Sequence, residues 1–260
     1  MILDEIVHKT NIRISKLKQN KSINDIKSES ELMSVNTNFP FEKALKSNDI
    51  SFICEVKKAS PSKGLISQDF QYLTIAKEYE NAGASAISVL TEPDFFLGNN
   101  KYLSEISNIV NIPVLRKDFI IDSYQIYESK CIGASAILLI CSLLDTNTIK
   151  QYISIADSLG LSALVEAHNE TEVESAIKAG ARIIGINNRN LKTFKVDINN
   201  SIRLRSMVPD NILFVSESGI RTPKDIETLR NIKTDAVLIG EMLMCSKDKK
   251  KQLEILRGNI

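Results

Sequence analysis

The 260 residues of this chain fall between the length of one ordinary domain and that of two, and α/β barrels reach this length as a single unit. Hydrophobic residues make up 43% of the chain and charged residues 25%, which is enough apolar material for a sizeable core and argues against disorder. Lys and Arg number 33 against 32 Asp and Glu, so the net charge of +1 argues against a nucleic-acid partner and requires any anion site to be built locally.

No apolar run approaches the roughly 18 residues of a membrane span, and the first twenty residues lack the features of a signal peptide. We therefore expect a cytoplasmic protein with no membrane partner. Four cysteines form no C-x-x-C pair, and three of them lie in apolar segments, which favours buried free thiols in a reducing compartment. His8 and His168 are the only histidines, which argues against a zinc site.

Residues 1–48 differ from the rest and are predicted to form an N-terminal helical extension of the same domain. Apolar positions between Ile2 and Leu17 approximate helical spacing. The polar stretch 19–31 is interpreted as a mobile connection, and FEKAL at 41–45 as a short helix.

In residues 49–260, short apolar runs alternate with segments of helical period. Eight runs predict strands, at 51–56, 85–90, 113–117, 135–140, 161–166, 182–187, 211–217 and 236–240. Most are continuous Val/Ile/Leu runs, so both faces of the sheet are expected to be covered. The clearest helical segments between them are 73–83, 123–133, 145–160, 170–180 and 223–232.

A Gly-Ala pair joins a helical segment to the next strand at Gly83, Gly133 and Gly180. These glycines are 50 and 47 residues apart, and each interval holds two strand–helix units, so eight units account for the chain after the extension. Strands that alternate with helices predict a parallel sheet, and eight of them favour a closed (β/α)8 barrel. An open doubly wound sheet is the alternative, but its Gly-rich fingerprint is missing after the first strand.

Charged residues follow the predicted strands, and active sites of such barrels form at the C-terminal ends of the strands. Glu55 and Lys57 are two residues apart and so share one face of their strand, while Lys117, Glu166 and Glu217 end three others. Opposite charges that converge on one cavity lower each other's desolvation cost and keep their pKa values adjustable for acid–base chemistry. We predict an active site here, with a merely solvated rim as the alternative.

Two loops predict a phosphate site. The segment 216–220 (SESGI) follows the seventh strand, and Gly240-Glu241 follows the eighth. Glycines at these points let backbone N–H groups approach an anion, which the N-terminus of a following helix also attracts. Loop 58–64 carries hydroxyls and lysines that are placed to close over the same group. A structural turn without a ligand is the alternative.

In chain order, these motifs resemble the indole-3-glycerol phosphate synthase family. The similar segments are EVKKASPSKG at 55–64, SVLTE at 88–92 followed by Phe95, Phe96 and Gly98, PVLRKDF at 113–119, LVEAH at 164–168, INNRNL at 186–191, VSESGI at 215–220 and LIGE at 238–241. The resemblance runs from about residue 40 to the end of the chain, and the helical extension also fits it. It implies the conversion of 1-(2-carboxyphenylamino)-1-deoxyribulose 5-phosphate into indole-3-glycerol phosphate, carbon dioxide and water in tryptophan biosynthesis. It implies neither a metal nor an organic cofactor.

The same resemblance implies a role for each site residue. Lys117 lies beside the carbonyl oxygen that gains negative charge, Glu166 manages the proton transfers, and Glu55 assists. Lys57 binds the substrate carboxylate, and Phe119, with Leu90 and Leu138, lies against the aromatic ring. Asn187 and Glu217 bind the ribulose hydroxyls, while Arg189 secures Asn187 or the first loop. The phosphate is bound by Ser60, Ser218, Gly219, Gly240 and Glu241. His168 is interpreted as a rim residue, and Asp118 as either a helix cap or a partner that restrains Lys117.

Two other functions compete with this interpretation. Another phosphosugar barrel, such as phosphoribosylanthranilate isomerase, uses a Cys and Asp pair, whereas Cys54 lies within a strand and Glu166 ends the fifth. A non-catalytic sensor of phosphate ligands would not retain the acid–base residues. The expected partner is a small phosphorylated substrate, and the resemblance leaves room for association with other tryptophan-pathway enzymes.

Overall fold

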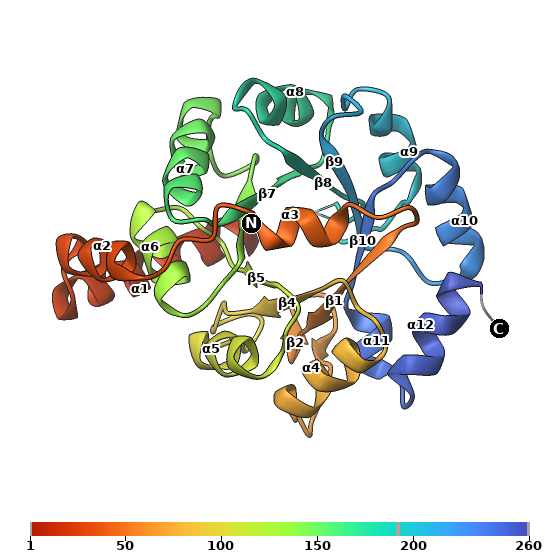
Figure 1. The fold of residues 1–260 in the computed structure, drawn as a ribbon, viewed down its shortest axis with the longest axis horizontal. Coiled ribbons are helices and arrows are strands. Elements are labelled where there is room, and N and C mark those ends of the chain that lie inside the picture. Colours follow the sequence, from red (N-terminus) through yellow and green to blue (C-terminus); the bar gives the residue numbers. More distant parts are fainter. Residues whose placement is uncertain (1, 191–192, 259–260) are drawn as a thin grey trace.

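The computed structural model describes residues 2–190 and 193–258, and its centre is a closed barrel of eight parallel strands ringed by helices (Figure 1). Around the barrel the order is β1-β10-β9-β8-β7-β6-β5-β4, and β1 pairs with β4 to close it. The strands are β1 (Ser51–Val56), β4 (Ala86–Leu90), β5 (Val114–Lys117), β6 (Ala136–Ile140), β7 (Ser162–Ala167), β8 (Ile183–Asn187), β9 (Leu213–Glu217) and β10 (Ala236–Ile239). The predicted (β/α)8 barrel is confirmed, and each predicted strand overlaps an observed one.

Helices follow the barrel strands and pack on their outer face. They are α4 (Tyr72–Asn81), α5 (Asn100–Ile109), α6 (Ser123–Cys131), α7 (Thr146–Ser158), α8 (Glu170–Lys178), α9 (Asn199–Arg205), α10 (Pro223–Asn231), α11 (Glu241–Cys245) and α12 (Lys249–Arg257). A two-stranded hairpin, β2 (Ala59–Ser60) with β3 (Gly64–Leu65), lies in the loop after β1. The predicted barrel segment 49–260 also includes 191–192 and 259–260, which lie outside the described residues.

Both faces of the barrel strands are buried, as the continuous apolar runs predict. In β7, Leu164 belongs to the cluster inside the barrel, while its neighbours Ala163 and Val165 pack against the helices. In β1, Ile53 points inward and Cys54 outward. Alternate residues of a strand point to opposite faces, so any residue two positions beyond an inward apolar residue also points into the barrel.

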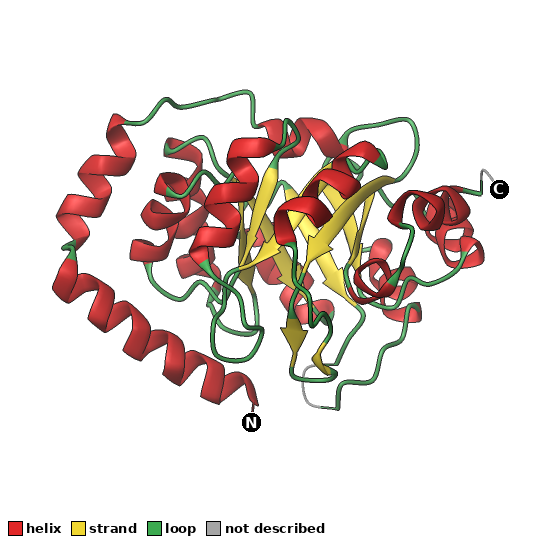
Figure 2. Cartoon of the chain, turned by 90° about the horizontal axis from the view of Figure 1, so that it is seen from below, coloured by secondary structure: helices red, strands yellow, loops and turns green. Residues whose placement is uncertain are grey.

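The N-terminal extension consists of α1 (Ile2–Asn20), α2 (Ile23–Leu32) and α3 (Pro40–Leu45). Helix α3 closes one end of the barrel, where Phe41 and Leu45 are fully buried among inward-facing strand residues. Arg182 fixes this helix, because its guanidinium lies 2.8 Å from both Glu42 and Asp157. Figure 2 shows α3 at one end of the barrel and the N-terminus at the opposite end, near β2 and β3.

Helix α1 runs along the side of the barrel and reaches the mouth. Arg13 forms an ion pair with Asp118 at 2.9 Å, and Lys18 one with Asp122 at 2.7 Å, so both tie α1 to the loop between β5 and α6. The first turn of α1, with Ile2 at its start, lines the cavity at the C-terminal ends of the strands. The extension therefore spans the barrel from its closed end to its open end.

The prediction of a mobile connection at 19–31 is wrong, because residues 23–32 form helix α2. Ser22 and Asp25 form a capping box at its start, a local signal that a polar composition concealed. Ile26 is buried with Ile14 and Tyr124, so α2 is fixed between α1 and α6. A helix with one narrow apolar stripe can be stabilised by a few buried residues when neighbouring helices pack against that stripe.

The prediction of buried cysteines is correct for Cys54 alone. All four thiols are free, but Cys131 and Cys141 are half-buried and Cys245 is exposed. Cys131 and Cys245 lie at helix ends and Cys141 directly follows β6, where the protein surface begins. An apolar neighbourhood in sequence does not decide the burial of a residue at the end of an element.

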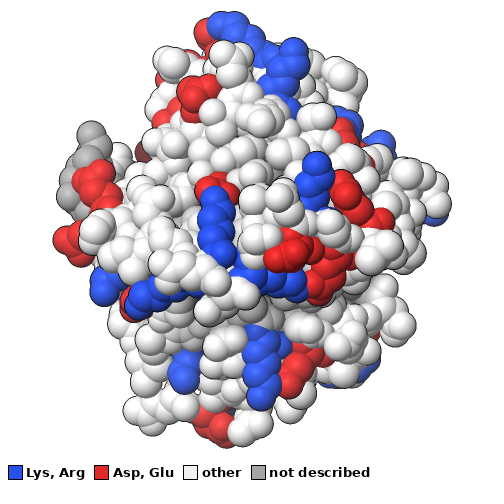
Figure 3. Space-filling view, turned by 90° about the vertical axis from the view of Figure 1, so that its left-hand side faces the viewer, with Lys and Arg blue, Asp and Glu red and all other residues white. Residues whose placement is uncertain are grey.

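Figure 3 shows the molecule from the left-hand side of Figure 1. On this face, positively charged Lys and Arg side chains are interspersed with negatively charged Asp and Glu side chains. This pattern agrees with the net charge of +1. Within residues 2–190 and 193–258, no helix is long and apolar enough to cross a membrane.

Candidate active site

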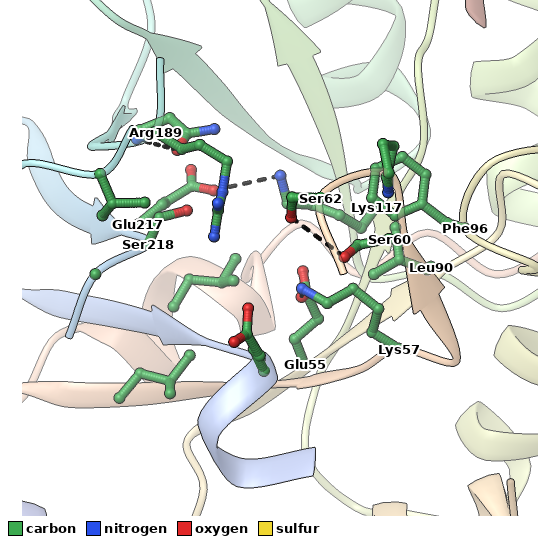
Figure 4. Close-up of a pocket in the computed structure, with 18 of the residues that line it drawn as sticks. Glu55, Lys57, Ser60, Ser62, Leu90, Phe96, Lys117, Arg189, Glu217 and Ser218 are labelled. Atoms are coloured by element: carbon green, nitrogen blue, oxygen red, sulfur yellow. Dashed lines mark hydrogen bonds and ion pairs between the residues drawn. The ribbon is translucent and has the colours of Figure 1, made fainter. Parts of the chain in front are cut away.

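A cavity of about 490 Å³ lies at the C-terminal ends of the barrel strands (Figure 4). Every residue predicted for the site lines it: Glu55, Lys57, Ser60, Lys117, Phe119, Glu166, Asn187, Arg189, Glu217, Ser218, Gly219, Gly240 and Glu241. The structure therefore brings together residues that are spread over most of the sequence. What each of them does is a separate question from where it lies.

Strand alternation explains why the charged residues point into the cavity. Lys117, Glu166 and Glu217 each lie two positions beyond an inward-facing apolar residue of the same strand, namely Leu115, Leu164 and Val215. Each strand thus fills the barrel with its apolar residues and presents one charged residue at the end. The side chains of Glu166 and Glu217 are 3% and 2% exposed, so their charges need partners within the protein.

Lys117 is that partner for two carboxylates at once. Its Nζ lies 3.1 Å from Glu166 Oε2 and 3.3 Å from Glu217 Oε2. A second ion pair joins Lys57 to Glu55 on β1, as their two-residue spacing requires. Two ammonium groups and three carboxylates therefore form one partly neutralised cluster. Figure 4 shows four of its members, Glu55, Lys57, Lys117 and Glu217, around the cavity.

The electrostatic environment of the cluster shifts the pKa values of its members in different directions. Burial by itself disfavours the Lys117 charge, but attraction to Glu166, Glu217 and Glu55 outweighs it and raises the pKa of Lys117. Burial opposes ionisation of Glu166 too, yet Lys117 and His168 lower its pKa below the usual value. Burial raises the pKa of Glu217 to about 7, and repulsion from Glu166 adds to this effect. At neutral pH the site thus holds an ionised carboxylate beside one that can carry a proton.

Two glycines make room for these carboxylates. A Cβ atom on Gly185 would collide with Glu217 Oε1, and one on Gly240 would collide with Glu55 Oε1 and lie 2.9 Å from Lys57 Nζ. Gly185 sits opposite Glu166 in the sheet register, so its missing side chain lets Glu217 lean across β8 toward Lys117. Gly240 was predicted as part of the phosphate site, and Gly185 was not predicted at all. The available signal for Gly185 was its position inside an apolar strand, where a glycine often marks the close approach of another group.

The loops after β9 and β1 shape one side of the mouth. Ser218 and Gly219 have φ of 68° and 86°, and Asn188 holds this turn by donating from Nδ2 to the Ser218 carbonyl at 3.0 Å. Across the mouth, Lys63 of the β2–β3 hairpin forms an ion pair with Glu241 at 3.3 Å. Asn188 lies within the INNRNL segment, but its supporting role for the turn was not predicted.

The apolar wall lies beside the charged cluster. Phe119 packs against Phe96 with ring centroids 6.0 Å apart, and both rings line the cavity. Leu90 and Leu138 line it as well, as predicted. The cavity therefore has one apolar side and one charged side, a combination that suits a ligand with an aromatic and a polar part.

Asp118 and Arg189, which neighbour the charged cluster in sequence or in space, make contacts that bear on their predicted roles. Asp118 is neither a helix cap nor a partner of Lys117: it pairs with Arg116 at 3.1 Å and with Arg13, and the N-cap of α6 is Asp122. Asp118 also accepts the Phe119 N–H at 2.8 Å, so it fixes the backbone between Lys117 and Phe119. Arg189 secures Asn187 through its backbone N–H, which donates to Asn187 Oδ1 at 3.0 Å.

The fold and this cavity define an acid–base enzyme of the (β/α)8-barrel class that accepts a small ligand. The sequence model of indole-3-glycerol phosphate synthase matches residues 3–256, and the chain belongs to this family of decarboxylating lyases in tryptophan biosynthesis. This membership decides against phosphoribosylanthranilate isomerase as the alternative.

Similar proteins agree with this assignment. The chain is 62% identical over 259 residues to indole-3-glycerol phosphate synthase of Ruminiclostridium cellulolyticum, with 100% of both chains covered. It is 58% identical to the same enzyme of Endomicrobium trichonymphae, with 99% of this chain and 100% of that protein covered. Among solved structures, 3-hexulose-6-phosphate synthase from Salmonella typhimurium shares the fold, with a TM-score of 0.65, 14% identity, and coverage of 80% of this chain and 96% of that one.

Proposed function

We propose that this chain converts 1-(2-carboxyphenylamino)-1-deoxyribulose 5-phosphate into indole-3-glycerol phosphate by general acid–base catalysis. The observation that carries the proposal is the position of Lys117 between Glu166 and Glu217 in the cavity of a chain that belongs to this family. A non-catalytic sensor would not require these buried charges, whose desolvation costs free energy.

Lys117 acts in the first step, which forms the new carbon–carbon bond. The ring carbon that carries the carboxylate attacks the ribulose carbonyl carbon, and negative charge collects on the carbonyl oxygen. A fixed ammonium group beside that oxygen stabilises the charge more than it stabilises the neutral carbonyl. The raised pKa of Lys117 keeps this group charged throughout the neutral pH range.

Glu166 acts in the later steps, with Glu55 assisting it. Loss of carbon dioxide restores the aromatic ring, after which the hydroxyl must leave as water and the ribulose C1 carbon must lose a proton, because the nitrogen keeps its hydrogen in the product. The ionised Glu166 accepts the proton from this carbon, and the carboxyl group that results returns a proton to the departing hydroxyl. Glu217, with a pKa of about 7, binds ribulose hydroxyls together with Asn187 as either donor or acceptor.

The remaining predicted residues bind the two ends of the substrate. Lys57 exchanges its pairing with Glu55 for the substrate carboxylate, and the aromatic ring lies against Phe119. The phosphate occupies the glycine-containing loops at the mouth, with Ser60, Ser218, Gly219, Gly240 and the backbone of Glu241 as its ligands. Arg189 holds Asn187 in place through its backbone N–H. Holding both ends brings the two reacting carbons into contact, an orientation effect worth about 7–11 kcal/mol at best.

The same proposal places the enzyme in the cytoplasm. Four free cysteines, two of them half-buried and one exposed, suit a reducing compartment. Association with other enzymes of the tryptophan pathway remains a prediction from the family resemblance.

Purified protein mixed with the carboxyphenylamino-deoxyribulose phosphate is expected to produce indole fluorescence in the presence of EDTA, because the side chains supply the acid and the base. The measurement is a fluorescence time course with product identity checked by mass spectrometry. A folded protein that leaves the substrate unchanged would refute the proposed function. Activity that disappears with EDTA and returns with a metal would refute the mechanism only.

Gly185→Ala is expected to lower kcat/KM by about 10²-fold, since the added methyl group pushes Glu217 away from Lys117. The matched control is Gly180→Ala, where no atom lies within 4 Å of the added Cβ, so only stability should suffer from its φ of 86°. The measurements are steady-state kinetics and thermal unfolding of both variants. If Gly185→Ala keeps wild-type kinetics, the close approach of Glu217 is not needed for turnover.

A further inference from the structure

His168 follows β7 immediately and lies behind Glu166 as seen from the cavity. Its Nε2 is 3.4 Å from Glu166 Oε1, whereas Lys117 contacts the other oxygen, Oε2. The imidazole is 14% exposed and does not contribute to the lining of the cavity described above. Each oxygen of Glu166 therefore has its own basic neighbour, Lys117 at Oε2 and the His168 imidazole at Oε1.

Glu172 fixes the orientation of this imidazole. One oxygen of Glu172 accepts the His168 backbone N–H at 2.8 Å and lies 3.0 Å from His168 Nδ1. Its other oxygen accepts from Asn169 Nδ2 at 2.8 Å, and Asn169 in turn caps α8 by accepting the Glu172 N–H. Because a carboxylate can only accept, Nδ1 carries a hydrogen, and Nε2 is left to face Glu166.

The Nε2 atom is buried and makes no hydrogen bond within residues 2–190 and 193–258. In a neutral imidazole with its hydrogen on Nδ1, the Nε2 lone pair would face a carboxylate oxygen, which is a repulsive contact. A proton on Nε2, or on Glu166 itself, turns the contact into an attraction. A hydrogen on Nε2 would therefore point toward Glu166 Oε1, 3.4 Å away.

The charges around the imidazole favour this proton. Burial disfavours the imidazolium, but Glu172, Glu166 and Glu217 together outweigh burial and raise the pKa of His168. Cys141, beside Glu172 and Glu166, stays a neutral thiol because burial raises its pKa to about 12. The opposing cation is Lys117, which lies on the far side of Glu166.

The reaction also requires a proton from outside. The substrate carries three negative charges when its carboxylate and phosphate are ionised, and the product carries two. Since carbon dioxide and water are neutral, each turnover consumes one proton. The proton that Glu166 removes from the ribulose C1 carbon and the one that the departing hydroxyl takes up cancel, so the oxyanion of the first step needs one more from a protein group.

We propose that His168, held by Glu172, stores the proton that each turnover consumes and supplies it through Glu166. Once the ring has closed, the Nε2–H bond breaks and an O–H bond forms at Glu166 Oε1. The carboxyl group then turns toward the cavity, its O–H bond breaks, and the proton passes to the oxyanion that Lys117 has stabilised. Solvent reloads the imidazole after the product has left. His168 does not touch the substrate, so it acts as a positioning and proton-supplying residue. The proposal rests on the role of Glu166 in the proposed function.

The test compares His168→Gln with Glu172→Gln in single-turnover fluorescence experiments between about pH 5 and pH 9. His168→Gln retains an amide that can bond to both neighbours but cannot ionise, and we expect its rate to fall about 10²-fold with little change in substrate affinity. The wild-type rate should fall as pH rises through the pKa of His168, and this decline should be absent from His168→Gln. Glu172→Gln removes a group that raises this pKa, so its decline should begin at lower pH.

His8→Gln is the matched control, because His8 is exposed on α1 and should leave the rate unchanged at every pH. A loss in His168→Gln that is equal at all pH values, or no loss, would overturn the proposal while an active wild type leaves the proposed function standing. If His168→Gln does not fold, imidazole NMR of the intact protein decides, since only two histidines must be assigned. His168 should titrate above the ordinary histidine pKa value of 6.5, and titration below that value would contradict the stored proton.

Discussion

Lys117→Met is expected to lower kcat by about 10³-fold or more while substrate affinity changes by less than about tenfold. Lys117 Nζ lies between Glu166 and Glu217, where it faces the oxygen that becomes charged only during reaction. Its loss therefore removes stabilisation of the transition state and little of the binding. The measurements are product fluorescence for turnover and calorimetric titration for affinity.

Two further variants make this result specific. Lys178→Met removes an exposed lysine on α8 and should keep wild-type kinetics. Lys117→Arg keeps a cation in the site but changes its shape and holds its proton more tightly. Turnover within about threefold of wild type in folded Lys117→Met would assign the stabilising role to another group. Thermal unfolding must be measured alongside, because the substitution leaves two buried carboxylates without their partner.

Glu166→Gln is expected to reduce kcat by about 10²–10⁴-fold, with the larger effect on the steps after ring closure. The amide has the shape of the carboxylate but can neither accept the proton from the ribulose C1 carbon nor pass one to the leaving hydroxyl. Single-turnover analysis by mass spectrometry should therefore reveal an intermediate that has closed its ring and has not yet lost water. Steady-state fluorescence gives the overall loss.

The comparison variant is Glu174→Gln, an exposed glutamate on α8 whose loss should leave kcat unchanged. Glu166→Asp retains the acid–base group on a shorter stem and should recover part of the activity. If Glu166→Gln forms product at the wild-type rate, Glu217 or Glu55 carries the proton transfers. If product formation stops before ring closure, Glu166 acts in the first step, which the mechanism above assigns to Lys117.

Much of the site follows from the sequence because the barrel obeys simple periodic rules. Apolar runs identified every strand of the barrel, since strands buried on both faces need apolar residues at successive positions, whereas the short hairpin strands β2 and β3 were not predicted. Once Leu115, Leu164 and Val215 point inward, the two-residue period fixes the direction of Lys117, Glu166 and Glu217. The closed barrel then requires their convergence, because the C-terminal ends of parallel strands meet at one rim.

The three-dimensional packing decided the remaining features. The polar residues 23–32 form α2 because α1 and α6 supply the contacts that a short amphipathic helix lacks by itself. Arg13 reaches Asp118 across 105 positions of sequence, a contact that no local pattern encodes. Cys245 is exposed although its segment is apolar, because it ends a short helix at the surface.

By itself, the sequence determined the barrel, the set of charged residues at its rim and the family to which the chain is similar, because all three depend on residue type and period. Only the tertiary structure showed that Glu217 leans over Gly185, that Glu172 and His168 stand behind Glu166, and that the pKa of Glu217 rises to about 7. These features depend on distances of 3 to 4 Å between side chains on different elements. Burial and charge act over such distances, and the order of residues along a chain does not specify them.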